Sequence, residues 1–451
     1  MKSNISEVID NNYCVGCGAC SVVNNKLSMI FDNEGKYIPA DINNLEGAEL
    51  EKLDLVCPFS SKTKNETVLS EELFRNNKHF DSDLGHYEAL FASSVNEKEY
   101  RIKGSSGGIG TWILAELKSK NLIDGVIHIK ESNKENKLFE YGLSSSLDEI
   151  SKGASSRYYP VEISDILNSI RDKQGTFVIT AIPCVAKAIR NICRVDKELN
   201  DKIKYIVGIF CGHMKSTKYA DLLALESGIN PYNENGYNIN FRVKKKGHNS
   251  DDYFTKIQQD SNIKITRNKD FISTNWGLGL MKLKACDYCD DVTAETADIT
   301  IGDAWLRKYT SDYRGTNVLV VRNQELLQLL QNARNEGRIE LEKLSRNDVY
   351  NSQAGGFRHK KEGLSYRLHL LETDKKWYPI KRVSPSNKIS EKRKNVINLR
   401  MKLQEKSINQ NLEGMSFDDF ISEMSLLINE HKKLTKPSMI EQLKRVIKKV
   451  L

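Results

Sequence analysis

Cysteines show the clearest chemical pattern in this 451-residue sequence, because eight of its nine fall into two groups of four. In the first group, the run Cys14-Val-Gly-Cys17-Gly-Ala-Cys20 spaces three thiols by two residues, and Cys57 is followed by Pro58. Bacterial ferredoxins bind a [4Fe-4S] cluster with such a run and end it with a cysteine before proline. Gly16 and Gly18 allow the tight turns that aim backbone N–H groups at the sulfurs.

A structural zinc site is the alternative interpretation of the first group. Zinc sites more often use two separated C-x2-C pairs or include histidine, and the first histidine of this chain is His79. We therefore favour an iron–sulfur cluster and expect a small ferredoxin-like module over residues 1–65.

The second group combines a close pair of cysteines with two at strand ends. One turn can present Cys286 and Cys289 to a metal or cluster, but a closed site needs about four ligands. Cys184 and Cys211 each follow an apolar run that predicts a strand, and ligands gather at the carboxyl edge of such sheets. These four positions predict a second metal centre; buried thiols without a metal are the alternative. Cys193 belongs to neither group and lies in a helical pattern, where it is expected to be a buried thiol without a metal.

Three further segments carry groups that bind anions or rings. Residues 104–108 form a glycine-rich loop before a predicted helix, whose unpaired N–H groups favour an anion. Arg157 can hold a phosphate or carboxylate, and Tyr158 can pack on a ring. Asp303, at a strand end, can accept from a ligand N–H or a ribose hydroxyl. The alternatives are a flexible loop, a surface arginine and a carboxylate that caps a turn.

Alternating strand and helix patterns predict an α/β domain over residues 66–355. Strand patterns lie at 87–95, 123–129, 176–182, 203–210, 298–301, 318–321 and 339–344, and helix patterns at 109–120, 164–172, 185–193, 216–227 and 324–335. This alternation predicts a largely parallel sheet. Strand patterns at 238–243, 253–258 and 262–266 predict an antiparallel insertion, and residues 66–86 are expected to form a polar helical linker.

Residues 356–451 are expected to form a basic α-helical extension. From residue 357 onward there are 22 Lys and Arg against 11 Asp and Glu, or +11, so the rest of the +8 chain carries −3. A charged helix is predicted over 388–406. The segment 439–451 predicts a basic amphipathic helix that either packs on the protein or rests on an anionic membrane surface. We expect no nucleic-acid binding, because aromatic residues do not alternate with the charges.

The sequence shows neither a spanning apolar stretch of about 18 residues nor the apolar core of a signal peptide. We therefore expect a cytoplasmic protein whose C-terminal helix can contact the inner membrane face. Thiols stay reduced in the cytoplasm, where patterned cysteines more often bind metal than form disulfides.

Eight motifs in order resemble the family of coenzyme F420 hydrogenase/dehydrogenase beta subunits. They cover roughly residues 10–325 and are the first cysteine run with Cys57-Pro58, Gly104-Ser-Ser-Gly-Gly108 with Thr111, Ile123-Asp-Gly-Val126, Ser155-Ser-Arg-Tyr158, Ile182-Pro-Cys-Val-Ala186, Ile209-Phe-Cys-Gly212, Cys286-x2-Cys289, and Ala297-Asp-Ile-Thr-Ile-Gly-Asp303. The resemblance implies Cys14, Cys17, Cys20 and Cys57 as ligands of one [4Fe-4S] cluster and Cys184, Cys211, Cys286 and Cys289 as ligands of another. It also implies FAD beside Gly104, Ser105, Ser106, Gly107, Gly108, Thr111, Ser155, Ser156, Arg157, Tyr158 and Asp303.

The family implies an iron–sulfur flavoprotein oxidoreductase. We expect a ferredoxin-like donor, or coenzyme F420 or another deazaflavin, to exchange electrons with a small-molecule or glycan-precursor substrate through the clusters and FAD. The basic extension resembles long bacterial members linked to surface polysaccharide synthesis. The alternatives are an electron-transfer subunit that feeds a partner enzyme and a scaffold with structural metal sites. The sequence identifies no catalytic proton donor.

Overall fold

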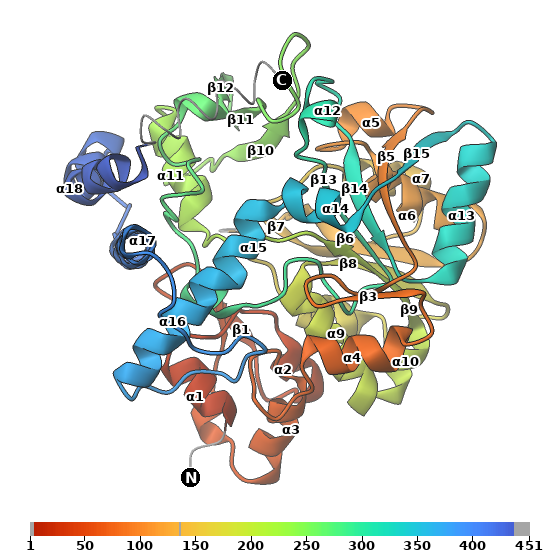
Figure 1. Ribbon diagram of the computed structural model, residues 1–451, viewed down its shortest axis with the longest axis horizontal. Helices are drawn as coiled ribbons and strands as arrows, with labels where there is room; N and C mark the ends of the chain where they lie inside the picture. Colours follow the sequence, from red (N-terminus) through yellow and green to blue (C-terminus); the bar gives the residue numbers. More distant parts are fainter. Residues whose placement is uncertain (1–3, 135–136, 437–451) are drawn as a thin grey trace.

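Apolar runs form the centre of one eight-stranded sheet in the computed structural model, which describes residues 4–134 and 137–436 (Figure 1). The strands are β5 (Ala89–Val95), β6 (Gly125–Glu131), β7 (Phe139–Ser144), β8 (Phe177–Ala181), β9 (Ile203–Ile209), β13 (Ile299–Asp303), β14 (Asn317–Val321) and β15 (Ile339–Lys343). Their order is β15-β5-β14-β13-β9-β8-β6-β7. The predicted α/β class is confirmed.

The sheet is parallel at its centre and antiparallel toward both edges. β13, β9, β8 and β6 pair in parallel, whereas β14, β5 and β15 on one side and β7 on the other pair antiparallel. The predicted parallel arrangement is therefore confirmed for the central strands. The edges differ because β7 and β14 each pair with the strand that precedes them in the chain, and such direct connections produce antiparallel neighbours.

Helices cover both faces of the sheet, each face with its own apolar core. α6 (Ile109–Ser119) and α13 (Gln324–Asn335) pack with Val178 on one face, and α9 (Pro183–Val195) and α11 (Lys218–Glu226) pack in the core that contains Ile179. Because β8 and β9 are parallel neighbours, the first turn of α9 and the loop after β9 meet at the carboxyl edge of the sheet.

The N-terminal segment forms short helices and one hairpin that pack against α9 (Figure 1). Its elements are α1 (Asn4–Asp10), α2 (Ala19–Val23), β1 (Met29–Phe31), β2 (Tyr37–Pro39), η1 (Ile42–Asn44) and α3 (Ala48–Val56). β1 and β2 pair antiparallel. The ferredoxin-like character of this segment stays a prediction.

The expected helical linker over 66–86 is only half right. α4 (Glu66–Phe74) is followed by a hairpin of β3 (His79–Asp81) and β4 (Gly85–Tyr87). The Asp81 carboxylate accepts from the Asp83 and Leu84 N–H groups at 2.8 and 3.2 Å. This Asx turn closes the hairpin in place of a further helical turn.

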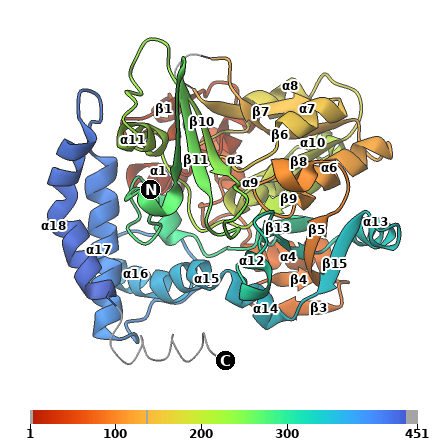
Figure 2. The same ribbon diagram turned by 90° about the horizontal axis from the view of Figure 1, so that it is seen from above.

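The predicted antiparallel insertion is confirmed, with β10 (Asn238–Val243), β11 (Phe254–Gln259) and β12 (Asn262–Arg267). The chain then forms α14 (Arg346–Ser352), α15 (Ala354–Lys360), α16 (Glu362–Thr373), α17 (Glu391–Ile408) and α18 (Phe417–Thr435). α17 corresponds to the predicted charged helix. It pairs with α18 beside α11 (Figure 2). The helix predicted over 439–451 lies outside the described residues.

Shorter helices complete the connections: α5 (Tyr100–Lys103), α7 (Leu147–Lys152), α8 (Ser164–Ser169), α10 (Lys197–Lys202), α12 (Arg307–Thr310), η2 (Asn268–Asp270) and η3 (Lys284–Tyr288). Within residues 4–134 and 137–436, no helix combines the length and the apolar character needed to cross a membrane.

Candidate metal centres and cofactor-binding loops

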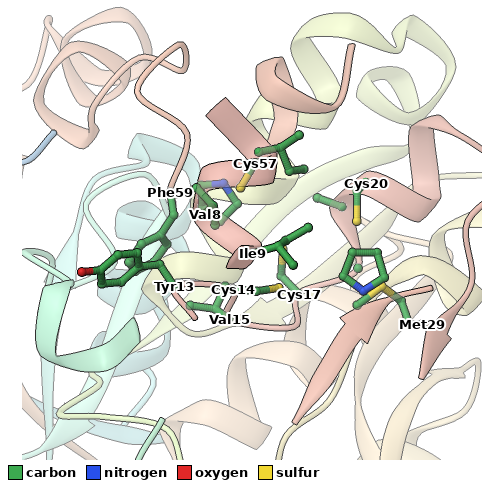
Figure 3. A pocket seen from close by; sticks show the side chains of 15 residues that line it. Val8, Ile9, Tyr13, Cys14, Val15, Cys17, Cys20, Met29, Cys57 and Phe59 are labelled. Carbon is green, nitrogen blue, oxygen red and sulfur yellow. The ribbon is translucent and has the colours of Figure 1, made fainter. Parts of the chain in front are cut away.

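The first four cysteines surround one hollow in the N-terminal segment. Cys14 and Cys17 lie in the loop that enters α2, Cys20 lies within α2, and Cys57 ends α3. All four line the same pocket, together with apolar side chains such as Val8 (Figure 3). The fold thus brings the distant Cys57 to the cysteine run, as expected for one four-ligand centre.

Gly16 and Gly18 shape this loop as predicted. Both have positive φ angles, +66° and +83°, and the Gly16 N–H points at the Cys14 sulfur at 3.4 Å. A Cβ at Gly16 would lie 2.6 Å from the Tyr37 carbonyl oxygen, and one at Gly18 would lie 2.6 Å from a Glu162 carboxylate oxygen. Backbone conformation and close packing therefore both require glycine here.

The second four cysteines meet in another pocket, at the carboxyl edge of the sheet. Cys184 stands in the first turn of α9, directly after β8, and Cys211 lies just beyond β9. Cys286 lies in η3, and Cys289 ends that helix. The Met214 N–H donates to the Cys286 sulfur at 3.1 Å. The expected convergence is present, and the role of these thiols as ligands stays a prediction.

A lysine from the C-terminal extension also lines the second pocket. Lys360 ends α15 and is only 1% exposed. Its ammonium donates to the Cys289 sulfur at 3.3 Å and to the Asp291 carbonyl at 2.6 Å. Burial opposes the charge of Lys360, but the neighbouring thiols, Cys289 first, raise the pKa of Lys360 above its ordinary value. Sequence reasoning missed Lys360, because no motif connects it to cysteines so far away in the chain.

The two cysteine groups are neighbours. Val15 and Phe59 line both pockets, so the same two side chains border each group. Burial and the nearby thiols, including Cys17 of the first group, raise the pKa of Cys184 well above its ordinary value. The two predicted centres are therefore adjacent.

Burial makes these thiols hard to ionise by themselves. It raises the pKa of Cys57 to about 12, and burial together with Cys211 raises the pKa of Cys286 to about 12. A metal removes the proton from a thiol that it binds. The donor sets therefore suit metal coordination better than free thiolates.

The glycine-rich loop 104–108 is packed tightly against the protein. A Cβ at Gly107 would lie 2.5 Å from the Ser93 carbonyl oxygen, and one at Gly108 would lie 2.7 Å from the Arg101 nitrogen. These close approaches within the chain already require glycine, independently of any ligand.

The helix that follows this loop has part of its N-terminus occupied. The Ile109 N–H donates to the Asn317 side chain at 3.1 Å, so this N–H group is not available to an anion. The Ser106 hydroxyl donates to the Thr316 carbonyl at 2.8 Å. Thr111 lies partly exposed in the first turn of α6.

The second predicted loop contacts the first. The Ser105 hydroxyl oxygen accepts from the Ser156 N–H at 2.7 Å and lies 3.3 Å from the Ser155 hydroxyl. Arg157 packs its guanidinium 5.1 Å from the centroid of the Phe139 ring. Its Nε and Nη1 are buried and have no hydrogen-bond partner within residues 4–134 and 137–436.

Arg242, which sequence reasoning missed, joins these loops to Asp303. It lies on β10, is 5% exposed, and pairs with both Asp303 carboxylate oxygens at 3.2 and 3.3 Å. It also donates to the Tyr158 hydroxyl at 3.3 Å and to the Ser105 carbonyl at 3.2 Å. The structure thus assembles all three predicted cofactor-binding segments around one arginine, and the Asp303 carboxylate holds that arginine.

Lys244 is a second cation that the motif search missed. It donates to the Ser106 carbonyl and to the Arg314 carbonyl, each at 2.6 Å, and burial lowers the pKa of Lys244 to about 7. Arg242 and Lys244 stand two residues apart at the end of a strand pattern. This period of two was the available signal that both face the same side.

Ring contacts connect these loops with the second cysteine group. The Tyr158 ring lies 5.3 Å from the Trp276 ring, and Trp276 lies 4.2 Å from the His213 ring, between centroids. His213 follows Cys211 by two residues, and its Nε2 is buried without a hydrogen-bond partner in the part of the chain that the structure describes.

Two family models match the region that contains these loops and the second cysteine group. The model for the C terminus of the coenzyme F420 hydrogenase/dehydrogenase beta subunit matches residues 175–347, and the N-terminal model matches residues 90–168. Together they span more than half of the chain. The protein belongs to this family. The first cysteine group and all residues beyond 347 lie outside the two matches.

Relatives of this family member occur in methanogens. A coenzyme F420-dependent sulfite reductase of Methanocaldococcus jannaschii is 23% identical over 222 residues, which are 46% of this chain and 32% of the relative. The match therefore spans about a third of that reductase. One component of the F420H2 dehydrogenase of Methanosarcina mazei is 24% identical over 310 residues, which are 68% of this chain and 81% of the relative.

A solved structure shares the fold of this family member. One chain of the F420-reducing [NiFe] hydrogenase complex of Methanosarcina barkeri superposes with a TM-score of 0.50 at 18% sequence identity. The superposition covers 67% of this protein and 99% of that chain.

Proposed function

We propose that this protein is an oxidoreductase that uses two [4Fe-4S] clusters and FAD. The observation that carries the proposal is the convergence of eight cysteines in two adjacent pockets. The first group would bind one cluster and the second group the other. Family membership supports a redox role.

We infer that each set of four thiols binds a cluster rather than a single ion. Zinc binds its sulfur ligands at about 2.3 Å from one centre. In the parts of the chain that the structure describes, no group of three or more His, Cys, Asp or Glu side chains is placed to hold one metal ion. In a cubane, each thiolate binds a different iron, so the sulfurs stand farther apart around a hollow.

The loops around Arg242 fit a flavin dinucleotide. Arg157 offers two buried nitrogens that lack hydrogen-bond partners among the described residues, and a guanidinium is well suited to phosphate or carbonyl oxygens. Tyr158 follows Arg157 in the chain, and its ring contacts those of Phe241 and Trp276 at a steep angle. Arg242 keeps both loops and Asp303 in place through the contacts described above, so that Arg157 and Tyr158 are held ready for the cofactor.

The arrangement of side chains supports a route for electrons. Bound FAD would handle electron pairs, and bound clusters would handle single electrons. Val15 and Phe59 border both cysteine groups, and His213, Trp276 and Tyr158 extend from the second group toward the cofactor-binding loops. We infer that electrons enter at the first group and leave at the flavin.

A ferredoxin-like protein is the proposed one-electron donor at the first group, and a small organic molecule is the proposed acceptor at the flavin. A reduced deazaflavin is the other proposed donor, and its hydride would go to FAD directly. The relatives named for coenzyme F420 support the deazaflavin. A glycan precursor as substrate, and with it a place in surface polysaccharide synthesis, is proposed from the basic extension. Neighbouring genes for glycan synthesis would support this part, and neighbouring genes of an unrelated pathway would contradict it.

Anaerobic purification of the full chain tests the proposal. We expect a brown protein with extractable FAD whose flavin is reduced when a reduced ferredoxin is added. A colourless protein that contains only zinc would overturn the assignment. A protein that contains iron but no flavin would overturn only the assignment of FAD and would leave that of the clusters.

An electron-transfer subunit is the second candidate, because one relative is named as a subunit of a dehydrogenase. Turnover distinguishes the two functions. The electron-transfer role is correct if the FAD of the isolated chain can be reduced but substrates in a pathway extract are converted to product only after a partner protein is added. Product formation by the isolated chain supports the complete enzyme.

A further inference from the structure

Balanced or acidic charges face the first cysteine group. The charged neighbours of Cys14 are Lys36 and Asp32, and the Lys36 ammonium is paired with Asp32 and with Glu34. Asp54 is the charged group beside Cys57. It is buried and paired with Lys62 at 3.2 Å. Each of these nearby cations therefore has a carboxylate partner.

The second group differs, because a buried ammonium donates directly to one of its sulfurs. Lys360 contacts Cys289 at 3.3 Å, and it lines the same pocket as Cys211 and Cys286. Its other hydrogen bond goes to a carbonyl, which carries no net charge. The positive charge of Lys360 is thus directed at the cysteines.

Further buried lysines lie near this group, together with buried acids. Lys215 and Lys282 lie near Cys286. Lys381 lies near Cys289, and its first charged neighbour is Asp290. Among the acids, Asp287 is paired with Lys282 at 2.5 Å. Asp291 acts on Cys211, and its carboxylate accepts from two backbone N–H groups at 2.8 and 3.0 Å.

A positive charge next to a cluster favours the reduced state. Reduction adds one negative charge, and a nearby cation stabilises that charge more strongly in a buried site than in water. Hydrogen bonds to the ligand sulfurs act in the same direction, and both are known determinants of cluster potential.

We propose that Lys360 raises the reduction potential of the cluster at the second cysteine group above that of the first, and so directs electrons inward. This inference rests on the proposed function. A one-electron donor reduces the first cluster by one electron. That electron then passes on, so the first cluster is reoxidised as the second is reduced, and two such transfers supply the electron pair for FAD. Lys360 is a positioning residue that acts through Cys289.

The C-terminal extension therefore contributes to the redox centre itself. Lys360 lies beyond residue 347, where the family match ends, and α15 carries it into the pocket of the second group. Family members without a cation at this position should lack the same difference in potential.

Redox titration of the anaerobically purified full chain tests the proposal. Two one-electron steps are followed by EPR, and Cys20→Ser and Cys211→Ser variants assign the steps to the first and second groups. We expect the second group to have the higher potential. In Lys360→Met, its potential should fall by at least about 59 mV, a tenfold change in the equilibrium constant for one electron. Lys360→Arg, which keeps the charge, should restore most of the potential.

Lys218→Met is the matched control. Lys218 also donates its ammonium to carbonyl oxygens, those of Ile408 and Gln410, but its charged neighbours are carboxylates. Because two of these carboxylates, Glu34 and Asp32, lie near the first group, this variant is a control for the second group, whose potential it should leave unchanged.

Three outcomes would overturn the proposal: a lower potential at the second group in the wild type, an unchanged potential in Lys360→Met, or an equal shift in Lys218→Met. Even if Lys360→Met fails to fold, the order of the two cluster potentials in the wild type tests the proposal. The absence of one cluster from the wild type would instead overturn the proposed function.

Discussion

The loop that carries the first three cysteines depends on two single residues, Gly16 and Gly18. Their chemical role was predictable, because a C-x2-C-x2-C run needs tight turns. The partners that exclude a side chain, the Tyr37 carbonyl and the Glu162 carboxylate, come from distant parts of the chain. The spacing of the cysteines therefore predicted the role of glycine at these two positions, and the packing of the folded chain gives a second reason why no side chain fits there.

Replacing Gly16 with alanine should impair the first centre. The left-handed backbone costs about 1–2 kcal/mol for a residue with a Cβ, and the contact with the Tyr37 carbonyl adds a clash. We expect a loss of about half of the iron and a lower midpoint of thermal unfolding. Gly414→Ala is the matched control, because Gly414 has a φ of +75° and open space around it. Equal effects of the two substitutions would show that the clash is unimportant.

Arg242 shows what sequence reasoning missed at the residue scale. In Arg242→Met, the Asp303 carboxylate loses its buried partner, which typically costs about 3–5 kcal/mol. The two loops also lose the side chain that joins them, so the flavin content of the purified protein should fall.

The control for this substitution is Arg267→Met, which removes a partner of Asp252 that is itself 39% exposed and should therefore cost much less stability. Retention of a full flavin content and of wild-type stability by Arg242→Met would contradict the assigned role.

The central strands and their helices were predictable at the scale of elements. The apolar runs of β8, β9 and β13 and the periodicity of α6 and α13 carry this information locally. Sequence reasoning failed at two local hairpins. The β3–β4 hairpin was taken as helix because the polar segment 66–86 lacks an apolar strand pattern, and the turn that decides it is set by Asp81 alone. β7 was not anticipated, although it pairs with β6, the strand directly before it in the chain.

The β6–β7 pair contains a buried histidine that should make stability depend on pH. His128 on β6 contacts the Ser144 hydroxyl on β7 at 2.8 Å, and burial, followed by Lys130, lowers the pKa of His128 from 6.5 to about 4. The unfolded chain therefore takes up this proton at higher pH than the folded chain. Stability should fall as the pH drops from 6.5 toward 4, by up to about 1.4 kcal/mol per pH unit.

Urea unfolding of the wild type and of His128→Gln at several pH values between 7 and 5 measures this effect. The variant should lose less stability per pH unit than the wild type. Parallel curves for the two proteins would show that His128 is not the titrating group.

At the scale of the whole molecule, sequence reasoning predicted which cysteines belong together but not what surrounds them. Cys184, Cys211 and the pair at 286 and 289 could be grouped from strand ends and spacing. Lys360 could not be found this way, because it reaches the pocket from a helix after the sheet. Sequence reasoning also could not predict that the two cysteine groups are adjacent. This is seen only in the fold, where Val15 and Phe59 line both pockets.

The central claim is that eight cysteines hold two clusters, and an iron and sulfide count tests it most directly. The anaerobically purified full chain should contain about eight irons and eight acid-labile sulfides. Cys20→Ser and Cys211→Ser should each abolish the EPR signal of one centre and spare the other, whereas Cys193→Ser, the control, should change neither count nor signals. A chain with zinc in place of iron, or cluster signals unchanged in both Cys20→Ser and Cys211→Ser, would contradict the account.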